Sequence, residues 1–234
     1  MELSYRIAGL TVNMATFGFA YDRSRPYQIE YVAEPDITVE SDWRALQERH
    51  PGVHELFCEY TSTGMDFYKK ILAFDGMLLH SSAIIMDGKA YLFSADSGTG
   101  KSTHTSLYRR YYGDERVRIL NDDKPAIRLE EGTFYAYGTP WSGKTDLNLN
   151  LRAPLAGICL LERGEKNEIA PMPARKALFR LLQQTCRFED EEKMDKVLYL
   201  MDMLLQTTPV WSMTCNMEPE AARVSYEAMS GKNK

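Results

Sequence analysis

One short segment, Ala95-Asp-Ser-Gly-Thr-Gly-Lys-Ser102, constrains this chain more than any other. Its spacing matches the G-x-x-x-x-G-K-[ST] phosphate-binding loop (P-loop), with Ala95 in place of the first glycine. Such a loop turns consecutive backbone N–H groups toward a phosphate, and the helix that follows adds its positive N-terminal end. Gly98 and Gly100 let the backbone approach the phosphate closely because they carry no Cβ. Ala95 can replace glycine only if its φ is negative.

The residues around the loop have the composition that this motif requires. Lys89–Ser94 is a run of strand-forming residues directly before it, and residues 103–111 can form a helix directly after it. Lys101 is expected to neutralise the β- and γ-phosphates, and the Ser102 hydroxyl to ligate Mg²⁺. The expected nucleotide-binding residues are Asp96, Ser97, Gly98, Thr99, Gly100, Lys101, Ser102 and Thr103. The alternative is a Gly/Ser turn that joins a strand to a helix and binds nothing.

Two adjacent carboxylates, Asp122 and Asp123, end the next predicted strand. If this strand lies beside the P-loop strand, both reach the phosphate site. A Mg²⁺-nucleotide enzyme needs one carboxylate for the metal and one to accept a proton. We assign the base to Asp122 and the metal ligand to Asp123, although the two roles can be exchanged. Without the P-loop nearby, an Asn-Asp-Asp turn that caps a strand would be the simpler interpretation.

Two further segments hold candidate site residues. His80 lies in a predicted strand, Met77–Ile85, where its residue type alone favours a core histidine. Gly138–Lys144 is a second glycine-bearing loop whose Trp141, Ser142 and Lys144 are of types that line sites; a structural loop with a packed tryptophan is equally compatible.

Length and composition set wider bounds. The 234 residues fit one large domain or one domain with an appendage, and we expect a β-rich N-terminal subdomain over 1–75 and a P-loop domain over 76–234. Strands are predicted at 5–12, 27–32 and 36–40 and a turn at 22–26, with helices at 174–186, 191–206 and 218–229.

A net charge of −5 gives no general attraction for nucleic acid or an anionic membrane. No apolar run is long enough to span a bilayer, and the N-terminus does not have the pattern of a signal peptide. The four separated cysteines, without C-x-x-C spacing, indicate reduced core thiols in a cytoplasmic protein.

Together, these residues resemble a known family. His80, the strand Ala90–Phe93, the loop Asp96–Ser102 and the Asp122–Asp123 pair are similar to the catalytic domain of HPr kinase/phosphorylase, over roughly residues 77–165. The loop and the Asp-Asp strand end also resemble phosphoenolpyruvate carboxykinase, which shares the nucleotide-binding fold. The chain is too short for a complete carboxykinase, and the arginine motif of HPr kinase near its substrate is not clear. The chain looks more like the divergent relatives of HPr kinase, some of which resemble peptide-tailoring kinases.

The resemblance implies an α/β fold with a mixed, twisted sheet around the P-loop helix and a helical C-terminal part. It implies a Mg²⁺- and ATP-dependent kinase that moves the γ-phosphate to a hydroxyl, with Ser or Thr of a peptide or protein as the first candidate acceptor. By this resemblance the catalytic residues are Asp122, His80, Lys101 and Lys144, and the metal is held by Ser102 and Asp123. The alternatives are a small-molecule kinase, such as one acting on free serine, and an ATP-binding scaffold without turnover. Carboxylation chemistry ranks last because of the length. No nucleic-acid or membrane partner is expected, and a homo-oligomer is compatible with the sequence.

Overall fold

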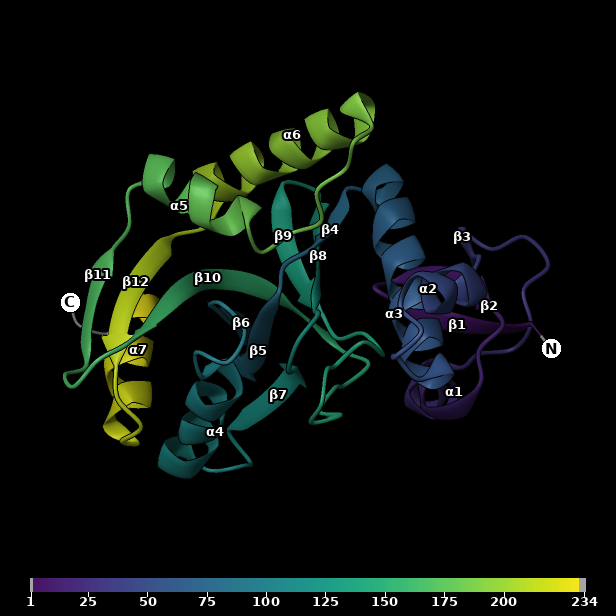
Figure 1. The fold of residues 1–234 in the computed structure, drawn as a ribbon. Helices are drawn as coiled ribbons and strands as arrows, with labels where there is room; N and C mark the ends of the chain where they lie inside the picture. The colour runs from purple at the N-terminus through teal and green to yellow at the C-terminus, as the bar shows by residue number, and fades with distance from the viewer. Residues whose placement is uncertain (1, 232–234) are drawn as a thin grey trace.

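The computed structural model describes residues 2–231 and contains two β-sheets with helices packed around them (Figure 1). The small sheet lies near the N-terminus and has the order β1-β2-β3. The large, mixed sheet has the order β4-β8-β9-β10-β6-β5-β7, extended by β12 beside β10 and by β11 beside β12. The small sheet is formed by β1 (Leu3–Ile7), β2 (Leu10–Met14) and β3 (Ile37–Val39). The strands of the large sheet are β4 (Gly76–Leu78), β5 (Ser81–Met86), β6 (Lys89–Ser94), β7 (Val117–Asn121), β8 (Ala126–Glu130), β9 (Thr133–Tyr137), β10 (Arg152–Arg163), β11 (Glu168–Pro171) and β12 (Val210–Cys215).

The helices cover both faces of the large sheet. α5 and α6 lie on one face, and α4 and α7 lie on the other (Figure 1). α1, α2 and α3 belong to the N-terminal part of the chain. The helices are α1 (Gly18–Ser24), α2 (Trp43–Arg49), α3 (Glu55–Lys70), α4 (Lys101–Tyr112), α5 (Ala174–Leu182), α6 (Glu191–Thr207) and α7 (Glu220–Ser230), with short 3₁₀ turns at Arg25–Tyr27 and Ile71–Phe74.

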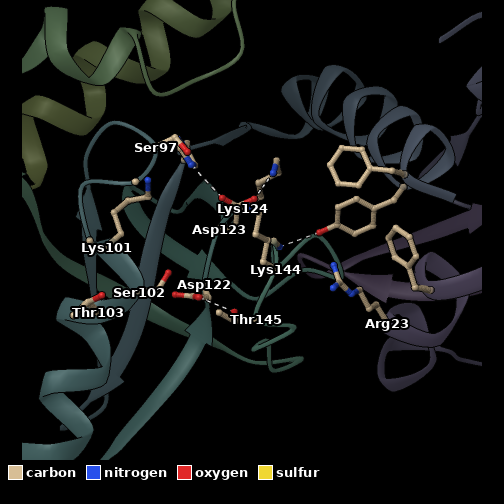
Figure 2. A pocket seen from close by; sticks show the side chains of 17 residues that line it. Arg23, Ser97, Lys101, Ser102, Thr103, Asp122, Asp123, Lys124, Lys144 and Thr145 are labelled. Atoms are coloured by element: carbon tan, nitrogen blue, oxygen red, sulfur yellow. Dashed lines mark hydrogen bonds and ion pairs between the residues drawn. The ribbon is translucent and has the colours of Figure 1, made fainter. Parts of the chain in front are cut away.

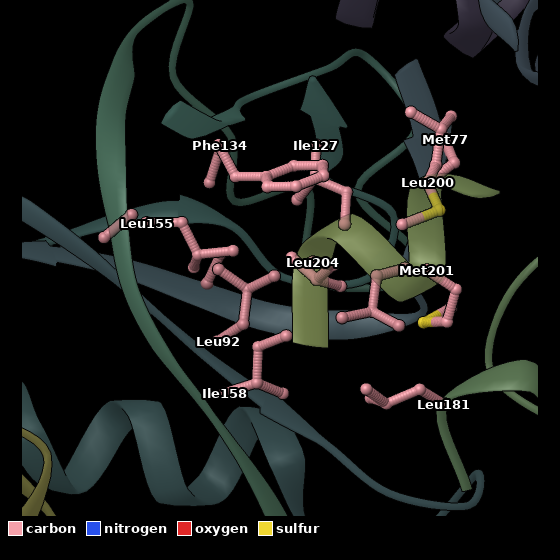
Figure 3. Packing of buried hydrophobic residues seen from close by; sticks show 14 of the residues in the cluster. Met77, Leu92, Ile127, Phe134, Leu155, Ile158, Leu181, Leu200, Met201 and Leu204 are labelled. Atoms are coloured by element: carbon pink, nitrogen blue, oxygen red, sulfur yellow. The ribbon is translucent and has the colours of Figure 1, made fainter. Parts of the chain in front are cut away.

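The core between α6 and the sheet follows from the apolar stripe of the helix. Leu200, Met201 and Leu204 are fully buried and lie among residues of the sheet, including Leu92 and Ile158 (Figure 3). Burial of each of these side chains contributes roughly 1.5–3 kcal/mol to the stability of the folded state. This packing fixes one face of the central strands. The three helices predicted in the C-terminal part correspond to α5, α6 and α7, and β12 lies between α6 and α7 in the chain.

The order of β6, β5 and β7 positions the candidate site. β5 pairs antiparallel with both neighbours, so β6 and β7 run in the same direction and end at the same edge of the sheet. The P-loop follows β6, and Asp122 follows β7. The two segments therefore meet at one edge of the sheet. The sequence predicted that β7 would lie directly beside β6, but β5 lies between the two strands.

Three local predictions need correction. The single strand predicted over 5–12 is a hairpin, because Ala8 and Gly9 have positive φ values of 51° and 80° and form a two-residue turn. The turn predicted at 22–26 is the end of α1 and a 3₁₀ turn. Residues 27–32 form no strand. The segment lies along β1 with one isolated bridge, Tyr5 to Gln28, and with bonds from the N–H groups of Ile29 and Val32 to Ser4.

The N-terminal part shares a hydrophobic core with the large sheet. Its buried cluster includes Phe67 and Tyr68 of α3 together with Ala126, Tyr137 and Trp141. The division at residues 75 and 76 stays a prediction. The four cysteines are unlinked; Cys58 and Cys159 are buried, and the other two are half-buried.

Candidate functional site

The P-loop has the backbone that its glycines predict. Gly98 and Gly100 have φ values of 81° and 121°, a region that side chains with a Cβ rarely adopt. Ala95 is buried and is not among the described residues with positive φ, so it fills the first position without strain. α4 begins at Lys101, directly after Gly100. The loop therefore has the strand–loop–helix context that phosphate binding requires.

Lys101 is held inside the site. Its side chain is buried, with the residue 7% exposed, and Nζ donates to the carbonyl oxygen of Ala95 at 2.9 Å. Burial lowers the pKa of the ammonium group, and the nearby carboxylates of Asp123, Asp122 and Asp96 oppose this shift. The ammonium group therefore faces negative charges that a bound phosphate would join.

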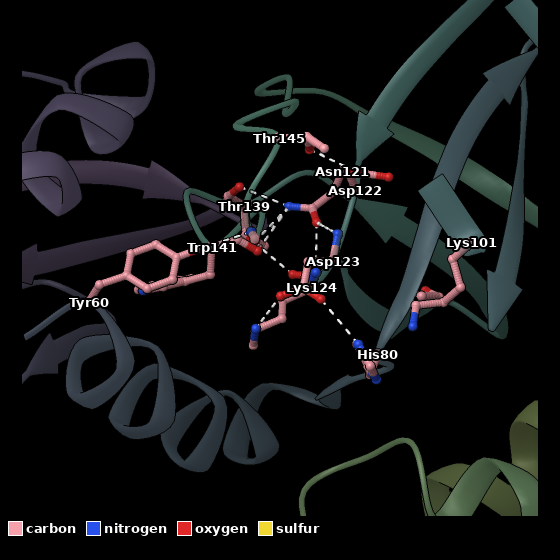
Figure 4. Close-up of polar contacts among 12 residues, drawn as sticks. Tyr60, His80, Lys101, Asn121, Asp122, Asp123, Lys124, Thr139, Trp141 and Thr145 are labelled. Carbon is pink, nitrogen blue, oxygen red and sulfur yellow. Dashed lines mark hydrogen bonds and ion pairs between the residues drawn. The ribbon is translucent and has the colours of Figure 1, made fainter. Parts of the chain in front are cut away.

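Asp122 is fixed by two hydroxyl groups. Ser82 Oγ donates to Oδ1 at 2.6 Å. Thr145 Oγ1 donates to Oδ2, also at 2.6 Å (Figure 4). The Ser82 hydroxyl is also 2.8 Å from Thr105 Oγ1, one turn into α4. Hydrogen bonds through the Ser82 hydroxyl thus connect Asp122 to Thr105 in α4, the helix that follows the P-loop.

Asp123 has charged neighbours instead. Its Oδ1 lies 3.1 Å from Nε2 of His80, and its Oδ2 accepts a hydrogen bond from Lys124 (Figure 4). Burial raises the pKa of the carboxyl group, but the contacts with His80 and Lys124 outweigh it and lower the pKa to about 2. Asp123 is therefore ionised at neutral pH.

These groups line one pocket of about 810 Å³ (Figure 2). It is lined by residues of the P-loop and the strand ends and by aromatic residues of α1 and α3. The predicted site residues that line it are His80, Ser97, Gly98, Gly100, Lys101, Ser102, Thr103, Asp122, Asp123 and Lys144. Asp96 and Thr99 belong to the loop but not to this lining. The structure therefore brings most of the predicted residues together.

The second glycine loop divides into buried and lining residues. Lys144 lines the pocket, whereas Trp141 is 2% exposed, stacks on Phe67 and donates from Nε1 to Thr63 at 3.2 Å. Ser142 is fully buried as well. Trp141 is thus a core residue, because α3 offers it an apolar surface at Gly64.

His80 stands in a different local context from the one expected. The predicted strand Met77–Ile85 is broken at Leu79 and His80, since β4 pairs with β8 and β5 pairs with β6. His80 therefore precedes β5 at the edge where the P-loop begins. The break aims its ring at Asp123 rather than into a strand face.

Several site residues carried no usable sequence signal. Phe19, Arg23, Phe57 and Tyr60 come from the N-terminal part, where no motif marks them. Arg23 lies over the rings of Phe19 and Tyr60 at 5.2 and 5.0 Å. Lys124 directly follows the Asp pair, and this adjacency was the one available clue.

Arg163 is a second overlooked residue. Its guanidinium group donates to the carbonyl oxygens of Thr99, at 3.1 Å, and of Gly98. These bonds attach the end of β10 to the main chain of the loop. Arg163 therefore supports the P-loop without lining the pocket.

Residues 2–231 contain no cluster of three or more His, Cys, Asp or Glu side chains that would bind a metal ion by themselves. No helix within this range is long and apolar enough to cross a membrane.

Comparison with known proteins gives one family. A search of curated proteins found no match. Among solved structures, the HPr(Ser) kinase/phosphatase from Coxiella burnetii is similar over 67% of this chain and 99% of that chain, with 9% identity and a TM-score of 0.41. A likeness at this level carries no argument about function. The family model described as SynChlorMet cassette protein ScmC matches residues 54–197, more than half of the chain. The protein therefore belongs to the SynChlorMet cassette protein ScmC family.

Proposed function

We propose that this protein is a Mg²⁺- and ATP-dependent kinase that transfers the γ-phosphate to a hydroxyl group, with Ser or Thr of a peptide or protein as the first candidate acceptor. The observation that supports it is the meeting of the P-loop and the Asp122–Asp123 pair in one pocket. Phosphoryl transfer depends mainly on positioning and on charge neutralisation, and this pocket offers groups for both.

The phosphate side of the pocket is cationic. The loop N–H groups and Lys101 would hold the β- and γ-phosphates of ATP, and Arg163 supports the loop behind them. Lys144 lines the same pocket and would add positive charge from the acceptor side.

The donor set fits Mg²⁺ bound together with a nucleotide. Mg²⁺ usually takes one or two carboxylates and completes its shell with phosphates and water, so a protein-only cluster is not required. The Ser102 hydroxyl makes no hydrogen bond within residues 2–231, and Asp123 stays ionised because of its low pKa. Ser102 and Asp123 would hold the ion, which neutralises phosphate charge.

Asp122 would accept the proton of the acceptor hydroxyl. From the described part of the chain, residues 2–231, each of its oxygens receives one hydrogen bond, and an ionised carboxylate oxygen can accept a second. As the acceptor oxygen bonds to the γ-phosphorus, the bond to the β-phosphate oxygen breaks, ADP leaves, and the proton passes to Asp122.

The acceptor side is aromatic. Phe57, which is 55% exposed, lines the pocket together with Phe19 and Tyr60. Such a wall suits an acceptor with an apolar group near its hydroxyl. We place the protein in the cytoplasm, with which the unlinked thiols are compatible.

The test is a screen with γ-labelled ATP and Mg²⁺ against free amino acids, hydroxyl-containing metabolites and Ser/Thr peptide libraries with varied neighbours. Labelled peptide supports the proposal, and a labelled small molecule alone supports a small-molecule kinase. Tight ATP binding without any product, including after incubation with cell extract, would indicate a scaffold. Absence of nucleotide binding would overturn the proposal.

A further inference from the structure

Gln184 connects two parts of the candidate site that are far apart in sequence. Its Nε2 lies 3.1 Å from Oδ1 of Asp96 in the P-loop, and its Oε1 lies 3.0 Å from Nδ1 of His80. The other ring nitrogen of His80 faces Asp123 at 3.1 Å. A continuous chain of polar contacts therefore runs from Asp96 through Gln184 and His80 to Asp123.

The backbone holds this chain in place. The His80 N–H donates to the carbonyl oxygen of Gln184 at 2.7 Å, and Thr185 Oγ1 donates to the carbonyl of Leu78 at 2.6 Å. The connection between α5 and α6 is thereby fastened across the break between β4 and β5. Gln184 is fixed by its main chain, so its amide has little freedom to turn elsewhere.

The carboxylate of Asp96 decides the orientation of the amide. Asp96 can only accept, so Nε2 of Gln184 must face it, and Oε1 must then face His80. Nδ1 of His80 is consequently a donor. On the other side of the ring, Nε2 faces the carboxylate of Asp123, which also accepts.

We propose that Gln184 is a positioning residue that links the state of the P-loop to the orientation of His80, and through His80 to Asp123. The inference rests on the proposed function for its catalytic consequence, but its structural part stands without it. A nucleotide that binds in the loop changes the electrostatic surroundings of Asp96. The Gln184 amide, bonded to both Asp96 and His80, then reorients the imidazole ring of His80, and the ring aligns Asp123 when phosphate is present.

The first experiment uses the protein without nucleotide. The chain has only four histidines, so His80→Asn assigns the ¹⁵N signals of the His80 ring directly. Gln184→Leu should shift these signals, because Nδ1 loses its acceptor. The matched control is Gln183→Leu, at an exposed neighbour without a side-chain hydrogen bond within residues 2–231. Unchanged His80 signals in a folded Gln184→Leu variant would overturn the inference.

The second experiment adds Mg²⁺ and a non-hydrolysable ATP analogue. Binding of the analogue should shift the His80 signals clearly in the wild type. In Gln184→Leu the shift should be much smaller, because the amide that connects Asp96 to the ring is missing. Equal movement in both would overturn the link. A wild type that binds no analogue would instead overturn the proposed function and leave the first experiment valid.

The third experiment separates positioning from folding. In single-turnover ADP formation from Mg-ATP, with water as acceptor, Gln184→Leu should lower the rate by about 10- to 100-fold, the loss expected from a small misplacement. The nucleotide Kd should change less than about threefold, and Gln183→Leu should match wild type. In a His80→Ala background, Gln184→Leu should have no further effect on the rate. Additive effects of the two substitutions would show that Gln184 does not act through His80.

Discussion

Nε2 of His80 lies 3.1 Å from Oδ1 of Asp123, and this contact joins the start of β5 to the end of β7. It helps to keep Asp123 ionised, whereas Asp122, the next residue, is held by two neutral hydroxyl groups. Adjacent residues of the same type thus have different electrostatic surroundings, and this difference leads to separate expectations for each.

Asp122→Asn and Asp123→Asn should therefore fail in different ways. Loss of the base should leave Mg²⁺-nucleotide binding nearly intact and lower turnover by about 10²- to 10⁴-fold. The loss will be smaller if the transition state is loose. Loss of the metal ligand should weaken Mg²⁺-dependent binding, because the ion loses a charged oxygen. The measurement is a Mg²⁺ titration of nucleotide binding beside single-turnover rates for both variants.

Three results would change this assignment. If Asp122→Asn is the binding variant and Asp123→Asn the turnover variant, the roles are exchanged. If both keep wild-type binding and rates, the pair is a strand-end cap. Tighter nucleotide binding in either variant would show that the second carboxylate repels the phosphates.

Lys101→Ala should weaken ATP binding and lower turnover by about 10²- to 10³-fold, the usual effect of removing one group that stabilises developing charge. Lys101 is the only lysine of the loop segment Ala95–Ser102, so no other ammonium group there replaces it. The measurement is isothermal calorimetry with Mg-ATP together with single-turnover kinetics. Lys89→Ala, at the exposed far end of β6, is the matched control. Undiminished binding and turnover in Lys101→Ala would contradict the P-loop assignment.

Glu59 should make stability fall as the pH rises. It is fully buried in α3, and its carboxylate oxygens have no hydrogen-bond partner within residues 2–231. Burial raises its pKa to about 7, although the nearby backbone of Phe17 acts in the opposite direction. The folded state thus favours the protonated carboxyl group. The contribution of Glu59 to stability is fully present below about pH 4.5, the pKa of this residue in the unfolded chain. It is lost as the pH rises to about 7 and does not change further above that. The total loss is at most about 3 kcal/mol.

Urea unfolding at pH 4.5, 6 and 8 tests the Glu59 prediction. Glu59→Gln removes the ionisation, so the variant should gain stability relative to wild type as the pH rises through this window. Glu55→Gln, an exposed position of the same helix, is the control and should show no such trend. A difference between Glu59→Gln and wild type that does not depend on pH would contradict the prediction.

Gly64→Ala should destabilise the protein, although alanine normally favours a helix by about 1 kcal/mol. A Cβ at Gly64 would lie 2.9 Å from Cδ1 of the buried Trp141, and a rigid ring cannot yield cheaply. We expect a loss of about 1–3 kcal/mol from the overpacking. Gly52→Ala, with open space around it, should be close to neutral. Thermal unfolding of both variants measures the effect, and a stabilised Gly64→Ala would show that the ring moves aside.

The sequence determined the local parts of this protein. The P-loop could be read from its glycines, because positive φ at Gly98 and Gly100 is a property of residues without a Cβ. The helices α5, α6 and α7 could be read from apolar periodicity, since a helix satisfies most of its main-chain hydrogen bonds within itself and shows one face to the core.

Only the tertiary structure decided which residues share the site. The break before β5 that aims His80 at Asp123, the bridge made by Gln184, and the aromatic wall of α1 and α3 depend on contacts between distant segments. Trp141 has the same local sequence whether it lines a pocket or packs on Gly64, and only the position of α3 makes it a core residue. Local propensity acts over a few residues, whereas burial and charge pairing depend on what the folded chain places opposite each side chain.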